Sequence, residues 1–204
     1  MGPGDVAYGM RAAYGLDVEA GAVTAWERGA SVPDPHQLTA LAGALWCAAS
    51  ELLGEPRTLR EFRLARSLSR ADVAREAGMD AEAYARVEET GVWTGEPRQA
   101  EALAGVLRLP VPVLLELTGR SEELTTLLRR AVTSRWQAYA GRVARVVPLP
   151  RGHVEDALRT LHEEYASLTT ASLAWGQPTG AGTRDASRDF LDHVLDHFWT
   201  ALAA

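Results

Sequence analysis

The sequence predicts an all-α fold, with two helix-turn-helix units in tandem followed by a C-terminal helical bundle. Three observations lead to this prediction. Residues 57–91 carry paired helix-start signals around a glycine turn, residues 1–56 repeat part of that pattern, and residues 120–204 show apolar stripes at helical spacing. We therefore expect three domains, comprising residues 1–56, 57–119 and 120–204.

The overall composition is that of a globular, mildly acidic protein. Of the 204 residues, 47% are hydrophobic and 24% are charged, which suffices for a sizeable core. The net charge of −6 disfavours non-specific binding to nucleic acid or anionic membranes. A single cysteine, Cys47, excludes an intramolecular disulfide and a cysteine metal site. Because neither a membrane-spanning run nor a signal-peptide pattern is present, we expect a cytoplasmic protein.

Residues 6–54 are expected to form the first helical unit. Gly29 is a typical C-cap for its second helix. Asp34 is a typical N-cap for the third, with Pro35 at the first helical position and Gln37 three residues after the cap. The expected helical segments are 10–16, 18–28, 35–46 and 49–54.

Residues 57–91 are expected to form three short helices. Two capping boxes, Thr58 with Glu61 and Ser69 with Asp72, mark the starts of the first two. Gly78 breaks the chain after the second helix, and Asp80 caps the third. The apolar positions of this unit are Leu59, Phe62, Leu64, Leu68, Val73, Ala74, Ala77, Met79, Tyr84 and Val87.

The first and second units are copies of one another. Segments 10–16, 24–29, 35–45 and 50–54 align in order with segments 62–68, 85–90, 97–107 and 115–119. The interval from Leu16 to Trp26 is about half of that from Leu68 to Val87. Roughly one helix and a turn are therefore missing from the first copy.

The order of these motifs resembles the Cro and phage-repressor-like helix-turn-helix family, also called the xenobiotic-response-element family. The second copy carries LREFRLARSLS, DVAREAG, VEETG and PRQAEALAGVL, and the first carries WERGASVPDPHQLTALAGAL. The resemblance covers about 110 residues and implies a lambda-repressor-like fold that binds double-stranded DNA. Residues 120–204 resemble no family that we recognise.

The resemblance implies that the second copy contacts bases through Ala81, Glu82 and Arg86, at the start and on the outer face of its third helix. Arg86 suits guanine, Glu82 suits cytosine N4, and Ala81 suits a thymine methyl group. The expected DNA-binding set is completed on the first two helices, where phosphates would lie, by Arg60, Arg63, Ser69 and Arg70.

The matching positions of the first copy, Ala20, Gly21 and Ala25, carry no hydrogen-bonding side chain. We therefore expect the first copy to pack on the second copy or to dimerise.

The C-terminal third is expected to form three helices over residues 121–147, 153–175 and 188–202, with a turn-rich connector at 176–182. A helical wheel places Arg135 and Arg142 toward the apolar stripe of the first. There they would pair with a carboxylate such as Glu164, or line an anion or ligand site.

His193 and His197 lie one helical turn apart, as zinc ligands can, but no third ligand is evident. We expect interfacial histidines and no metal site.

These features predict a sequence-specific, bacterial-type transcriptional regulator that binds double-stranded DNA through its second copy as a homodimer. The C-terminal bundle would dimerise or bind a small-molecule or protein effector. The alternative is a protein–protein interaction adaptor that has kept the fold and lost DNA binding; the acidic N-terminal half and Glu82 favour it. We expect no catalytic residues, no cofactor and no enzyme activity, because no nucleophile triad or phosphate-binding glycine loop is present.

Overall fold

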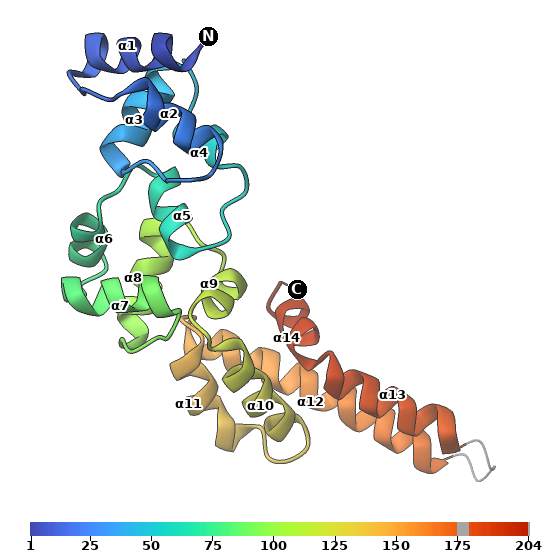
Figure 1. The fold of residues 1–204 in the computed structure, drawn as a ribbon. Coiled ribbons are helices and arrows are strands. Elements are labelled where there is room, and N and C mark those ends of the chain that lie inside the picture. Colours follow the sequence, from blue (N-terminus) through green and yellow to red (C-terminus); the bar gives the residue numbers. More distant parts are fainter. Residues whose placement is uncertain (175–179, 204) are drawn as a thin grey trace. The chain divides into compact units, whose positions relative to one another are not determined.

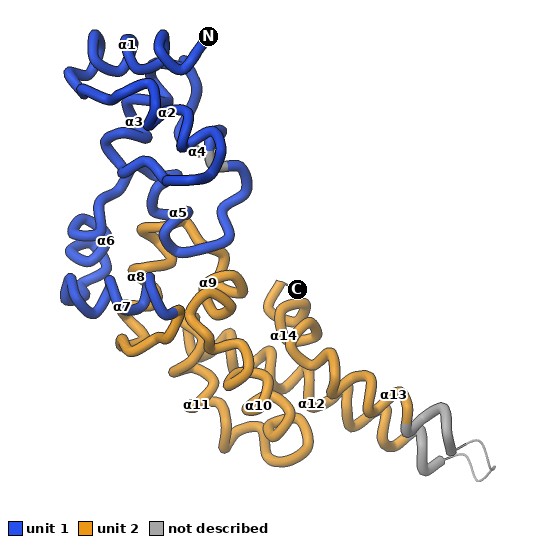
Figure 2. The backbone as a smooth tube through the Cα atoms, in the orientation of Figure 1, with its two compact units in different colours: residues 1–90 blue, residues 91–204 orange. Residues whose placement is uncertain are grey.

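The computed structural model describes residues 1–174 and 180–203, and every regular element in this part of the chain is an α-helix (Figure 1). The all-α prediction is thereby confirmed. The chain divides into two compact units, unit 1 with residues 1–90 and unit 2 with residues 91–204 (Figure 2). None of the described helices has the length and apolar character needed to cross a membrane.

The first four helices of unit 1 are α1 (Pro3–Tyr14), α2 (Ala20–Glu27), α3 (Pro35–Ala44) and α4 (Ala49–Leu53). Their small core is built from Val6, Ala7, Met10, Val23 and Ala40. The predicted cap of α3 is confirmed, because Asp34 Oδ1 accepts from the Gln37 N–H at 2.8 Å. The predicted end of this helix at residue 46 is wrong: Leu45 caps it, and Trp46 takes a left-handed φ of 56°.

The rest of unit 1 comprises α5 (Leu59–Ala65), α6 (Arg70–Glu76) and α7 (Ala81–Thr90). Both predicted capping boxes form, at Thr58 with Glu61 and at Ser69 with Asp72. Gly78 turns the chain with φ +64°. Asp80 then caps α7, because its Oδ1 accepts from the N–H groups of Glu82 at 2.9 Å and Ala83 at 3.2 Å.

The helix order confirms that the first copy lacks one helix. Along the chain α1, α2, α3 and α4 correspond to α5, α7, α8 (Pro97–Leu107) and α9 (Val111–Leu117). No helix lies between α1 and α2, where residues 15–19 are all described, whereas the second copy has α6 at the matching place.

The remaining helices of unit 2 are α10 (Ser121–Val132), α11 (Gln137–Val146), α12 (Arg151–Ala174), α13 (Gly180–Asp192) and α14 (Val194–Ala203). One core joins them, and its largest fully buried side chains include Leu124, Leu128, Leu158 and Phe198. Within unit 2, α12 packs against α10, α11, α13 and α14.

Three boundary predictions in this unit are wrong. The expected single helix over 121–147 is broken between Val132 and Gln137. There the hydroxyls of Thr133 and Ser134 donate back to the carbonyls of Arg129 and Arg130, which competes with continuation of the helix. The last expected helix is divided between α13 and α14, and α13 begins already at Gly180. Of the expected connector, residues 176–179 lie outside the described part of the chain.

Candidate functional site

A buried ion pair joins α5 to α7 at the centre of the second copy. Arg63 on α5 is 4% exposed, and its guanidinium donates to both carboxylate oxygens of Glu88 on α7, at 2.6 and 3.0 Å. The third donor of Arg63, Nη1, bonds the Leu68 carbonyl at 3.0 Å. The Glu88 side chain is only 1% exposed. A bidentate pair in this setting holds α5 and α7 in one geometry.

Two further groups complete the shell of Glu88. Arg70, the first residue of α6, donates from Nε at 2.7 Å, and the Tyr84 hydroxyl donates at 3.0 Å. Burial raises the pKa of Glu88, but the hydrogen bonds from Arg63 and Arg70 outweigh it, so the carboxyl pKa lies below its ordinary value of 4.5. Burial, together with the adjacent Glu88 charge, raises the pKa of the Tyr84 phenol. The carboxylate thus links all three helices.

Acidification is expected to weaken unit 1 through this carboxylate. Because its folded pKa is depressed, Glu88 contributes stability that is fully present above its ordinary pKa and is lost as pH falls through the folded value. The free energy of unfolding of the wild type should therefore fall as the pH is lowered through and below the ordinary carboxyl pKa of 4.5. Glu88→Gln should flatten this slope, which denaturant titrations at a series of pH values measure. A residual slope from Asp72, whose pKa is lowered by its hydrogen bonds with Ser69 and Arg75, should remain in both proteins.

The expected base-contacting side chains all lie on the exposed side of α7. Ala81, Glu82 and Arg86 are exposed, whereas Tyr84 and Val87 are buried beneath them. Figure 1 shows α6 and α7 next to each other, and Gly78 lies in the turn between them. The helix therefore presents one face outward while the opposite face is anchored in the unit.

The expected phosphate contacts are placed less uniformly. Arg60 is exposed, and Ser69 is occupied as the N-cap of α6. Arg70 is 43% exposed and also pairs with Glu89 at 3.2 Å. Arg63 belongs to the buried pair, so the expectation that Arg63 contacts phosphate is wrong. The reason is that it stands one turn from Leu59 and beside Leu64, both of which are buried in the core.

The first copy has not kept this buried pair. The repeat aligns Arg11 with Arg63 and Glu27 with Glu88. Arg11, however, pairs with Asp17 at 3.5 Å, with side chains 70% and 81% exposed, and Glu27 is exposed. A pair in water contributes little stability. Without an α6 counterpart, the first copy is held by its apolar core.

The expected placement of Arg135 and Arg142 toward the apolar stripe is wrong. Both are exposed, and neither is within ion-pair distance of a carboxylate among the described residues. The helix break before Gln137 causes the difference. A helical wheel that assumes one continuous helix assigns Arg135 and Arg142 to the wrong face. Arg135 lines one cavity with Trp136 and His162, whereas Arg142 lines another, so the two do not share a site.

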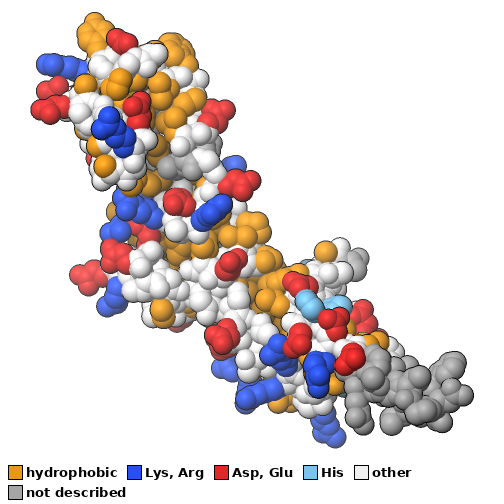
Figure 3. All heavy atoms as spheres, turned by 45° about the vertical axis from the view of Figure 1, so that its right-hand side comes forward, with side chains coloured by type: hydrophobic (Ala, Val, Ile, Leu, Met, Phe, Trp, Pro, Cys, Tyr) orange, Lys and Arg blue, Asp and Glu red, His pale blue; other side chains and the backbone are white. Residues whose placement is uncertain are grey.

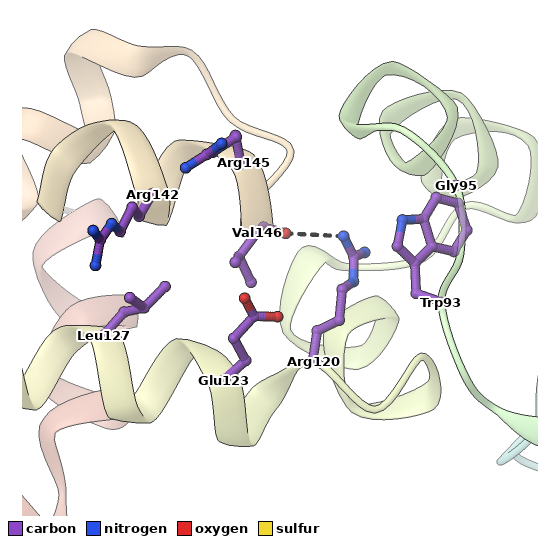
Figure 4. A pocket seen from close by; sticks show the side chains of 8 residues that line it. All are labelled: Trp93, Gly95, Arg120, Glu123, Leu127, Arg142, Arg145 and Val146. Carbon is purple, nitrogen blue, oxygen red and sulfur yellow. Dashed lines mark hydrogen bonds between the residues drawn. The ribbon is translucent and has the colours of Figure 1, made fainter.

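The cavity at Arg142 contains a residue that sequence reasoning missed, Arg120. Its side chain is 7% exposed, donates from Nε to Thr118 Oγ1 at 3.1 Å and donates from Nη1 to the Val146 carbonyl at 3.0 Å (Figure 4). Its guanidinium lies 4.9 Å from the centre of the Trp93 ring. Burial lowers the pKa of Arg120 to about 10, against the charge of Glu123. In the sequence, the feature next to Arg120 that sets it apart is Gly119, which ends the preceding helix.

The two histidines of the pair have different neighbours in the structure. His193, between α13 and α14, contacts Asp189 on α13, and the His197 ring stacks on Phe190 with centroids 4.2 Å apart. No group of three or more possible metal ligands occurs among the described residues.

Comparisons with models of known protein families, with curated proteins and with solved structures found no match for this chain.

Proposed function

We propose that this protein binds double-stranded DNA as a regulator of transcription, with helix α7 of the second copy in the major groove. One observation carries the proposal: α7 is fixed from behind by Tyr84, Val87 and Glu88, and Ala81, Glu82 and Arg86 remain exposed. In the helix-turn-helix pair α6–α7, α7 is the helix that follows the glycine turn and faces outward. This is the arrangement by which helix-turn-helix proteins contact base edges. The resemblance to the Cro and phage-repressor-like family supports the same proposal.

The proposed contacts are few and of mixed charge. Arg86 is the side chain suited to a bidentate contact with guanine, and Glu82 next to it repels phosphate. Arg60 and Arg70 are placed for backbone contacts, although Glu88 and Glu89 share the charge of Arg70. We infer that a monomer binds DNA weakly. A homodimer binds more tightly, because it contacts two half-sites about one helical turn apart.

Arg86→Ala should weaken specific binding by about 5- to 150-fold and relax preference at one base pair. The loss of a bidentate contact is the reason. The measurement is a mobility shift at low salt, using sequences enriched by wild-type protein from a randomised double-stranded library. Arg98→Ala serves as the matched control, because Arg98 is exposed on α8, outside α5–α7, and its loss should leave the affinity unchanged. Absence of any enriched sequence or shift for the wild type would overturn the proposal.

A second function is favoured by the surface of the first copy. A largely apolar groove of about 390 Å³ runs through it, lined among others by Val23, Trp26, Leu41 and Leu45. Trp46 and Tyr8 are 93% and 74% exposed in the same four-helix segment, and Figure 3 shows apolar side chains gathered over this end of unit 1. Apolar surface of this kind is typical of protein interfaces. A protein–protein adaptor is therefore the candidate that remains if the DNA experiment fails.

A further inference from the structure

Unit 2 contains a cavity of about 360 Å³ whose polar lining is mostly arginine. Arg120, next to the start of α10, and Arg142 and Arg145, on α11, are among its lining residues (Figure 4). Trp93 and Leu127 supply apolar wall. The indole can lie flat here because residue 95 is glycine; a Cβ at Gly95 would come within 2.7 Å of Trp93 Cζ2. The volume lies within the range usual for small-molecule sites, about 300–1,000 Å³.

Arg120 is not fully satisfied by the protein. Its Nε and Nη1 have partners at Thr118 and Val146, but Nη2 is buried and has no hydrogen-bond partner among the described residues. An unpaired donor on a buried cation costs stability unless a ligand or water completes it. An acceptor bound in the cavity beside Trp93 would complete this donor.

The charge of the cavity lining selects the kind of acceptor. The lining contains three guanidinium groups, of Arg120, Arg142 and Arg145, and one carboxylate, of Glu123, which leaves an excess of two positive charges. Arg142 and Arg145 are exposed and have no ion-pair partner among the described residues. A phosphate monoester carries close to two negative charges near neutral pH and three acceptor oxygens, whereas a single carboxylate has one charge.

We propose that this cavity binds a small organic molecule through a phosphate monoester group. The phosphate lies between Arg120, Arg142 and Arg145, and the organic part lies along Trp93 and Leu127. The site is built wholly from unit 2 and does not rest on the proposed DNA binding. The site includes Arg142 but not Arg135, which lines a different cavity.

The test is calorimetric titration of the full chain with three probes: phenyl phosphate, inorganic phosphate and benzoate, at constant ionic strength. Phenyl phosphate is expected to bind more tightly than inorganic phosphate, because its ring contacts Trp93 and Leu127, and more tightly than benzoate, because of its second charge. Phosphate binding without a gain from the ring would overturn the organic-ligand assignment. Equal binding of benzoate, or no binding of either phosphate, would overturn the proposal altogether.

Matched variants locate the binding. Arg142→Gln and Arg145→Gln change exposed side chains, so both variants should fold normally. Each should lower the affinity for phenyl phosphate by about tenfold or more. Arg130→Gln, an exposed arginine of α10 outside the cavity, should bind as the wild type does. Unchanged affinity in both cavity variants, or an equal loss in Arg130→Gln, would place the ligand elsewhere and overturn the assignment.

Discussion

Arg63→Ala is expected to lower the free energy of unfolding of unit 1 by about 3–5 kcal/mol, because it leaves the Glu88 carboxylate buried without its bidentate partner. Arg70 and Tyr84 would still donate to Glu88, but Arg70 is half-exposed and Tyr84 is neutral. Hydrogen exchange of the full chain measures the effect, since the amides of α5, α6 and α7 should lose protection together.

A double replacement separates the pair from its surroundings. Arg63→Met combined with Glu88→Leu removes both charges and keeps the volume, so it should cost much less than Arg63→Ala alone. Arg60→Ala, on the exposed side of the same helix, should change stability by less than about 0.5 kcal/mol. Should Arg63→Ala prove as mild as Arg60→Ala, the buried pair would not be the link between the helices.

Phe198→Ala is expected to destabilise unit 2 by about 3–5 kcal/mol. The Phe198 ring is fully buried on α14 in the core that also contains Leu124, Leu128 and Leu158, and it meets Trp199 edge-on with centroids 5.1 Å apart. Removing it leaves a cavity that the helices packed against α14, which are α10, α12 and α13, cannot fill by small shifts. Denaturant unfolding followed by circular dichroism, with hydrogen exchange to assign the change to unit 2, measures the loss.

Two neighbouring replacements calibrate this effect. Phe198→Leu keeps most of the apolar volume and should cost less than half as much. Thr200→Ala alters an exposed position of the same helix, where the hydroxyl only bonds the Asp196 carbonyl, and should be nearly neutral. A Phe198→Ala protein as stable as Thr200→Ala would show that α14 is not part of the unit 2 core.

Local signals in the sequence predicted the fold class and the short helices of unit 1. The Thr58, Ser69 and Asp80 caps and the Gly78 turn depend on residues at most four positions apart, and all four form as expected. The missing helix of the first copy could also be counted from the spacing of the repeat. The helix break near Ser134 was not predicted, although it is also local: it depends on a hydroxyl hydrogen bond to the carbonyl four residues back, which the spacing of apolar residues does not show.

The sequence by itself therefore determined an all-α chain, its caps and turns, and an outward face of α7 that carries Ala81, Glu82 and Arg86, because these follow from helical periodicity and nearest-neighbour hydrogen bonds. Only the tertiary structure decided which arginines are available. In the sequence Arg63 does not differ from the neighbouring arginines, but in the structure it forms a buried ion pair with Glu88, 25 residues away. Arg120 donates to the Val146 carbonyl and lines the same cavity as Arg142 and Arg145, which the spacing of residues in the sequence does not show. The sequence shows that an arginine is charged, but the packing of helices that are distant in sequence determines which group it pairs with.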